Sequence, residues 1–137
     1  MRLWHTLLID VLPRAQLISQ WRECAAIAGA IRRNGTPNHL LVNFVLDYDF
    51  DNFISYAGIV REEMYRRGYA PPEAVWRKIQ SLKTGYVSLA IYDIYPDIMD
   101  NEYLTICYYN IYEKYLRSGV SEEEWQEIQY KVSDLYE

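Results

Sequence analysis

A single carboxylate stands in the middle of the stretch LISQWRECAAIAGAIRRNG, residues 17–35. At helical steps of three and four, Glu23 shares a stripe with amides, a hydroxyl and methyl groups, namely Gln16, Ser19, Gln20, Ala26 and Ala30. Such small neighbours leave room for a ligand to reach the carboxylate. From the pattern alone, the simpler interpretation is a partly solvated surface glutamate paired with Arg22 or Arg61.

The second group that could do chemistry is the α-amine of Met1, followed by Arg2, Leu3 and Trp4. The large Arg2 side chain is expected to prevent removal of the initiator methionine. An α-amine titrates close enough to pH 7 that a usable fraction is neutral, and a neutral amine can attack an aldehyde carbon to form a Schiff base. Leu3 and Trp4 are apolar and would anchor the terminus against the core. An amine of this kind matters only if the fold places it in a site.

Basic residues occur as the pairs Arg32-Arg33, Arg66-Arg67 and Arg77-Lys78. The first two pairs lie at expected helix C-termini, where positive charge complements the helix dipole. Both flank loops that could face one groove, so contacts to phosphate are the alternative. His39, in the loop 34–39, is either a loop or capping residue or a phosphate contact.

The net charge of −5 is unevenly distributed. Residues 1–83 carry a net charge of +3, whereas residues 84–137 carry −8 and hold 10 of the 14 tyrosines. A nucleic-acid or nucleotide partner would have to meet the first part, because phosphates are repelled by the second. Tyrosine suits interfaces, so the acidic part could bind a protein partner or a second copy of the chain.

The pattern of apolar residues and caps predicts a mainly α, compact single-domain helical fold over residues 1–137. Helices are expected at 13–33, 50–69, 73–82, 101–119 and 121–137, the last opened by a capping box of Ser121 and Glu124. Residues 40–50 are ambiguous between strand and helix, and 86–96 are of uncertain type. Buried thiols are expected for Cys24 and Cys107, with a cytoplasmic location. The sequence contains neither an apolar run long enough for a membrane span nor a cluster with metal-ligand spacing.

Several of these stretches together resemble a known family. The opening MRLWH, the helix QLISQWRECAAIAGAIRRNG and the segment ending in EEMYRRGY are similar to the pyrimidine-dimer DNA glycosylase family of endonuclease V type, over about residues 1–72. The resemblance implies a compact α domain with no metal or organic cofactor. It also implies that the N-terminal amine of Met1 attacks C1′ of a damaged or abasic nucleotide, with Glu23 assisting. Arg22 matches a family arginine that contacts DNA phosphate, and Arg2, Arg32, Arg33 and His39 are the other candidate DNA contacts.

The chain also departs from the family pattern. One turn after the glutamate the family has a further arginine, and this chain has Ala26. Three hypotheses therefore stand in order. The first is a DNA glycosylase and abasic-site lyase, the second is a relative that binds or cleaves a free nucleotide or nucleoside, and the third is a non-catalytic relative with a protein partner on residues 84–137.

Overall fold

The computed structural model describes residues 1–136. Within this range the chain forms five α-helices and three short 3-10 helices and contains no strand. In chain order the elements are η1 (Thr6–Val11), α1 (Arg14–Asn34), η2 (Asn43–Asp47), α2 (Phe50–Arg66), α3 (Glu73–Gln80), η3 (Ile91–Asp93), α4 (Asn101–Leu116) and α5 (Glu122–Leu135). The predicted all-α fold class is confirmed. None of the described helices is both long and apolar enough to cross a membrane.

Helix α1, which carries Glu23, is bounded by the residues that the sequence indicated. Pro13 precedes its first turn, where the missing N–H of proline costs nothing. Gly35 ends the helix in the left-handed conformation, with a φ of 78°, and its N–H donates to the Ile31 carbonyl at 2.8 Å. The result is a continuous helix of 21 residues that can present different side chains to different neighbours.

Three of the other helices, α2, α4 and α5, begin at side-chain caps, whereas Pro72 precedes α3 without one. Asp49 accepts a hydrogen bond from the N–H of Asp51 at the start of α2, and Asp100 accepts one from Tyr103 at the start of α4. The predicted capping box of Ser121 and Glu124 is present at α5. Residues 40–50 contain η2 rather than a strand, and residues 86–96 are irregular apart from η3.

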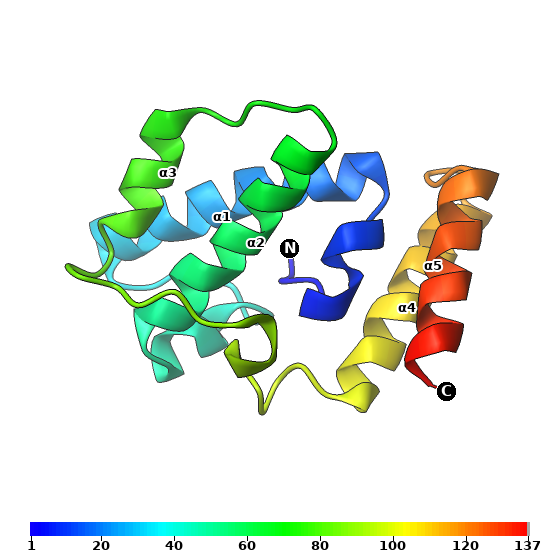
Figure 1. The fold of residues 1–137 in the computed structure, drawn as a ribbon. Coiled ribbons are helices and arrows are strands. Elements are labelled where there is room, and N and C mark those ends of the chain that lie inside the picture. The colour runs from blue at the N-terminus through cyan, green and yellow to red at the C-terminus, as the bar shows by residue number, and fades with distance from the viewer. Residues whose placement is uncertain (137) are drawn as a thin grey trace.

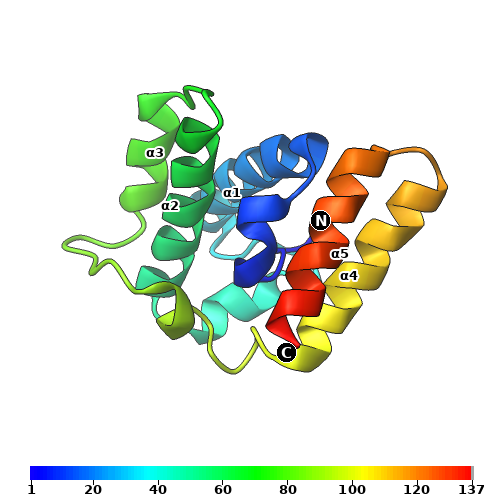
Figure 2. The same ribbon diagram turned by 45° about the vertical axis from the view of Figure 1, so that its right-hand side comes forward.

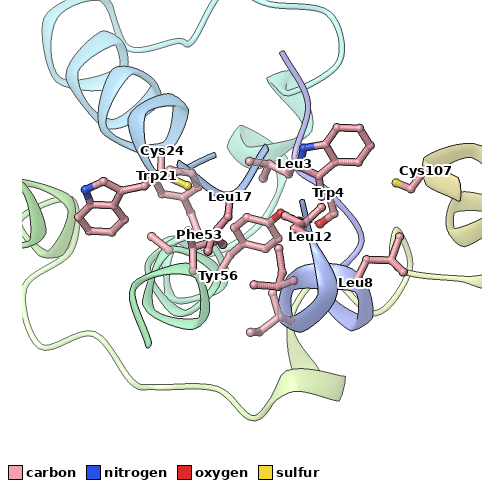
Figure 3. Packing of buried hydrophobic residues seen from close by; sticks show 14 of the residues in the cluster. Leu3, Trp4, Leu8, Leu12, Leu17, Trp21, Cys24, Phe53, Tyr56 and Cys107 are labelled. Carbon is pink, nitrogen blue, oxygen red and sulfur yellow. Dashed lines mark hydrogen bonds between the residues drawn. The ribbon is translucent and has the colours of Figure 1, made fainter. Parts of the chain in front are cut away.

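The amino-terminal segment forms the centre of the molecule. Figure 1 shows it between α2 on one side and the pair α4–α5 on the other. Leu3 is 0% exposed, and Trp4, Leu8 and Leu12 are buried with it. Figure 3 shows these side chains in one buried cluster with Leu17 and Trp21 of α1 and Phe53 and Tyr56 of α2. The start of the chain is therefore held in place by the core itself.

Helices α4 and α5 form a hairpin beside the amino-terminal segment (Figure 2). The rings of Tyr108, Tyr112 and Tyr115 on α4 lie 5.1–5.2 Å from that of Trp125 on α5, and these contacts hold the hairpin together. Buried residues of the hairpin, such as Leu104 and Ile128, belong to the same apolar cluster as Leu3. The basic part and the acidic part of the chain thus share one core. Cys24 and Cys107 are buried free thiols, as predicted.

Candidate active site

Gln20 connects the amino terminus to Glu23. Its side chain is 0% exposed, and its Oε1 accepts a hydrogen bond from the backbone N–H of Trp4 at 2.8 Å. Its Nε2 donates to the carbonyl of Arg2 and to Glu23 Oε2, each at 3.0 Å. A single buried amide therefore positions both the start of the chain and the carboxylate, and all of its hydrogen bonds are made.

Two tyrosines hold the neighbouring carbonyls of the same segment. The Tyr56 hydroxyl of α2 lies 2.5 Å from the Trp4 carbonyl and 2.8 Å from Gln20 Oε1, and donates its proton between these two acceptors. The Tyr103 hydroxyl of α4 donates to the Leu3 carbonyl. Three helices thus supply side chains to the backbone of residues 2–4, which limits the movement of the terminus.

A cavity of about 230 Å³ opens beside these groups. It is lined by Met1, Arg2, Trp4, Glu23, Leu41, Asn110 and Lys114. Met1 is 44% exposed, so the acidic part of the chain does not cover this residue, and α4 contributes Asn110 and Lys114 to the cavity lining. The two catalytic candidates, Met1 and Glu23, meet at one cavity, although they form no direct ion pair within the described residues.

The surroundings of Glu23 alter its acidity. Burial raises the pKa of the Glu23 carboxyl above its ordinary value, because the charged form loses solvation. The Met1 amine and Lys114 lie close enough to oppose this rise electrostatically, without reversing it. A carboxyl group with a raised pKa that lines the same cavity as an amine is suited to general acid and base chemistry. Neither Arg22 nor Arg61 pairs with Glu23 among residues 1–136, so the predicted ion pair is wrong, whereas the predicted partial solvation of Glu23 is confirmed.

Two more of the candidate DNA contacts lie close to this cavity. The Arg2 guanidinium lies 5.8 Å from the centre of the Trp4 ring. His39 lies in the loop after α1, where its Nδ1 accepts a hydrogen bond from the N–H of Leu41. Ala26 is exposed one turn beyond Glu23, so nothing at that position reaches into the cavity.

The other three candidates lie on a different side of α1. Consecutive helical residues are about 100° apart, which turns Arg22 away from Glu23 and into a cavity formed with α3. Arg32 and Arg33 line a second cavity against α3, and Arg32 donates to the Ser81 hydroxyl at 2.7 Å. The structure therefore brings Met1, Arg2 and Glu23 together but separates them from Arg22, Arg32 and Arg33.

The pair Arg66-Arg67 does not share a groove with Arg32-Arg33. Both side chains bind the buried carboxylate of Glu63, and both also donate to the carbonyl of Asp10. Their charges are thus used inside the fold, where they link α2 to the segment before α1.

Sequence reasoning missed three residues of the cavity region. The helical stripe predicts that Gln20 lies beside Glu23 where a ligand could reach it, but its side chain is fully buried. Asn110 and Lys114 come from the acidic part, which was expected to repel phosphates. Their spacing of four residues places both on one face of α4, but no local pattern indicates that this face meets the amino terminus. Among the described residues, no three His, Cys, Asp or Glu side chains lie close enough to hold a metal ion.

The fold and the site define a small all-α protein whose amino terminus and a half-buried glutamate line one cavity. The basic side chains of Arg2 and Lys114 line the same cavity. Residues 1–77 match the family model described as pyrimidine dimer DNA glycosylase. This match spans more than half of the chain, and the chain belongs to that family of DNA repair glycosylases. It includes Met1, Glu23 and the first half of α3, and extends slightly beyond the resemblance seen over residues 1–72. Neither a curated protein nor a solved structure matched the chain.

Proposed function

We propose that the protein is a DNA glycosylase with abasic-site lyase activity in which the Met1 amine is the nucleophile and Glu23 assists. The observation that carries the proposal is the Gln20 side chain, which bonds to the backbone on both sides of Leu3 and to Glu23. Such an arrangement fixes the terminus relative to the carboxylate before any substrate binds, which lowers the entropic cost of reaction.

The chemistry requires groups of the chain, the substrate and water. The neutral amine attacks C1′ of the deoxyribose, the bond from C1′ to the base breaks, and the base leaves with a proton. Ring opening gives an imine between the Met1 nitrogen and C1′. Removal of a proton from C2′ then expels the 3′ phosphate by β-elimination. Water finally hydrolyses the imine and restores the amine. At an abasic site the same amine condenses with the aldehyde and releases water.

Glu23 has two roles in this sequence. Its carboxylate stabilises the positive charge that develops on the sugar and on the imine nitrogen, where a nearby anion in a partly desolvated site is most effective. Its raised pKa also lets it take a proton and return it during the transfers at O4′ and C2′. The hydrogen bond from Gln20 holds one carboxylate oxygen and leaves the other free for the substrate.

The remaining lining residues supply positive charge and a polar contact. Arg2 and Lys114 both line the cavity, and each can neutralise a phosphate next to the reacting sugar. Asn110 lies one turn before Lys114 and can bind the sugar or the base. His39 in the adjoining loop can contact a flanking phosphate.

Borohydride trapping tests the proposal. The protein is incubated with an oligonucleotide that holds one abasic site, sodium borohydride is added, and a covalent adduct is sought on a denaturing gel. Mass spectrometry of the intact protein first establishes that the chain tested begins at Met1. We expect an adduct with the wild-type chain and none after acetylation of the amine. A chain extended by one glycine before Met1 is the matched control, because it keeps an amine but moves it by about 3.8 Å.

The Glu23→Gln variant separates chemistry from binding. We expect this variant to bind the abasic oligonucleotide and to lose strand cleavage. An adduct that persists after acetylation would remove Met1 from the mechanism. Cleavage at the wild-type rate in Glu23→Gln would likewise remove Glu23. A folded protein that forms no adduct at all would contradict the proposal and favour the nucleotide-binding or partner-binding hypothesis.

A further inference from the structure

The cations of the chain fall into two groups. Of the 14 Lys and Arg side chains, six form ion pairs with carboxylates in residues 1–136, namely Arg61, Arg66, Arg67, Lys83, Arg117 and Lys131. Of the rest, Arg2 and Lys114 line the candidate active site, and five more line cavities between α1 and α3, namely Arg14, Arg22, Arg32, Arg33 and Lys78. Unpaired positive charge is therefore concentrated in places where a ligand can reach it.

The two cavities between α1 and α3 adjoin each other along these helices. Each has a volume of about 430 Å³, and both are lined by Ala25 of α1 and Val75 of α3. We call them together the α1–α3 groove. In the described part of the chain no carboxylate lines this groove. A groove with this charge is complementary to a polyanion.

One end of the α1–α3 groove is basic. Arg32, Arg33 and Lys78 surround it, and no described carboxylate pairs with any of them. Arg33 folds back along the helix over Gly29, where a Cβ atom would lie only 3.0 Å from Arg33 Nη1. The absence of a side chain at Gly29 thus allows the Arg33 guanidinium to line the groove.

The other end is apolar with cations at its margin. Ile18, Trp21 and Met64 contribute to its lining together with Pro71, Pro72 and Val75. Arg14 stands at the margin, with its guanidinium 5.9 Å from the centre of the Tyr69 ring, and Arg22 is exposed beside it. Phosphates gain nothing from apolar walls, whereas the faces of unpaired bases do.

The α1–α3 groove and the active-site cavity flank the same exposed ridge of α1. Arg22 borders the groove and Glu23 borders the cavity, although they are consecutive residues. The ridge between them carries the exposed residues Ser19 and Ala26, which have small side chains. A polynucleotide strand can therefore pass from one side of α1 to the other without meeting a bulky or acidic group.

We propose that the α1–α3 groove binds an unpaired segment of the DNA strand, with phosphates on its basic end and bases on its apolar end. This inference rests on the proposed function, because it takes DNA as the substrate class. Duplex DNA presents only its backbone and would leave the apolar end unused. The substrate is then DNA that is locally unpaired next to the reacting nucleotide.

Binding measurements test the groove directly. The affinity of a labelled, undamaged oligothymidine strand is measured by fluorescence anisotropy over a range of salt concentrations, beside that of the corresponding duplex. We expect the single strand to bind more tightly. In the double variant Arg32→Gln/Lys78→Gln, the slope of log K against log salt should become shallower by roughly 1.4, since each phosphate contact contributes about 0.7 for a single strand. Arg117→Gln removes an equally exposed charge outside the groove and should leave the slope unchanged.

A second pair of variants tests the point at which the two cavities of the α1–α3 groove adjoin. Ala25 lies where the two cavities meet, so Ala25→Glu places a carboxylate in the middle of the groove, and Ala25→Gln adds the same bulk without the charge. We expect at least a tenfold loss of strand affinity for Ala25→Glu relative to Ala25→Gln. If Ala25→Glu does not fold, the substitutions at exposed Arg32 and Lys78 carry the test.

Three results would overturn the inference. Equal or tighter binding of the duplex would mean that the groove follows a duplex backbone. A slope change in Arg117→Gln of half that in the double variant or more would mean that the slope follows total charge, because Arg117→Gln removes one charge and the double variant removes two. Equal affinities of the two Ala25 variants would place the strand elsewhere. If the single strand binds as expected but no borohydride adduct forms, the proposed function is overturned and the inference about the groove is kept. If an amine-dependent adduct forms but the groove variants bind the strand like the wild type, the proposed function is kept and the inference about the groove is overturned.

Discussion

Gln20 and Glu23 lie one turn apart on α1, and Gln20 Nε2 donates a hydrogen bond of 3.0 Å to Glu23 Oε2. The same nitrogen donates to the Arg2 carbonyl, and Gln20 Oε1 accepts from the Trp4 N–H. The relationship makes the position of the chain terminus depend on a residue that touches no substrate. Gln20 is thus a positioning residue for both catalytic candidates.

Replacement of Gln20 by alanine should cost both stability and reactivity. It leaves the buried Trp4 N–H without a partner and opens space in the core, for which we expect a loss of about 2–4 kcal/mol in the free energy of unfolding. Gln16→Ala is the matched control, because Gln16 Oε1 has no partner in the structure and its loss should cost under about 1 kcal/mol. Chemical denaturation gives the stabilities. Trapping at an abasic site should slow in Gln20→Ala, and an unchanged rate would contradict the positioning role.

Glu23→Gln should make the protein more stable at neutral pH. Burial raises the pKa of Glu23 in the folded state above its unfolded value, so the folded protein favours the protonated form. The favourable contribution of Glu23 to the free energy of unfolding is therefore fully present below the unfolded pKa. It is lost as the pH rises through the pKa of Glu23 in the folded state. The melting temperature of Glu23→Gln should exceed that of the wild type at pH 7, and the difference should vanish below the ordinary glutamate value of 4.5.

A suitable control for this measurement is Glu113→Gln, which alters an exposed carboxylate that pairs with Arg117. This variant should show no gain at neutral pH. If the wild type were more stable than Glu23→Gln at pH 7, the nearby positive charges would outweigh the effect of burial on the pKa of Glu23. The expected trade of stability for a poised carboxyl group is common in active sites.

Two fully buried tyrosines should respond in opposite ways to loss of the hydroxyl. Tyr56 and Tyr95 are both 0% exposed, but only the Tyr56 hydroxyl has hydrogen-bond partners. Tyr56→Phe leaves the Trp4 carbonyl without its donor and should destabilise the protein by about 1–3 kcal/mol. Tyr95→Phe removes an unsatisfied polar atom and should be neutral or stabilising by about 1 kcal/mol. Thermal unfolding of the two variants measures these changes in stability. A larger loss of stability in Tyr95→Phe than in Tyr56→Phe would contradict the prediction.

The helices were predictable because their ends are encoded locally. Pro13 and Gly35 bound α1, and Ser121 with Glu124 opens α5, each through contacts within a few residues. Residues 40–50 and 86–96 gave no such signal, since short apolar runs without periodicity fit several structures. They take their shape from tertiary contacts, such as the hydrogen bond from the Tyr95 N–H to the Asn52 side chain.

The candidate site was only partly predictable. Family resemblance, rather than the pattern around it, selected Glu23, because a lone glutamate on a small-residue stripe has a simpler explanation. Gln20 shares that stripe, and only the packing of residues 2–4 against it shows why it is buried. Arg22 adjoins Glu23 in sequence but borders another cavity, since neighbours on a helix point in different directions. Contributions from α4 depend on how the hairpin docks, which no local rule specifies.

Lys114 provides the test of whether the acidic part of the chain takes part in DNA binding. It stands in a region with a net charge of −8, yet it lines the cavity with Met1 and Glu23 and acts on the Glu23 charge. Lys114→Gln should weaken binding to an abasic oligonucleotide and make its salt dependence shallower by roughly 0.7–0.9, the value for one phosphate contact. Arg117→Gln removes the same charge less than one turn further along α4, outside the cavity, and should leave the binding of this oligonucleotide unchanged. Equal effects of the two substitutions would show a response to total charge, and no effect of either would place the DNA entirely on residues 1–83.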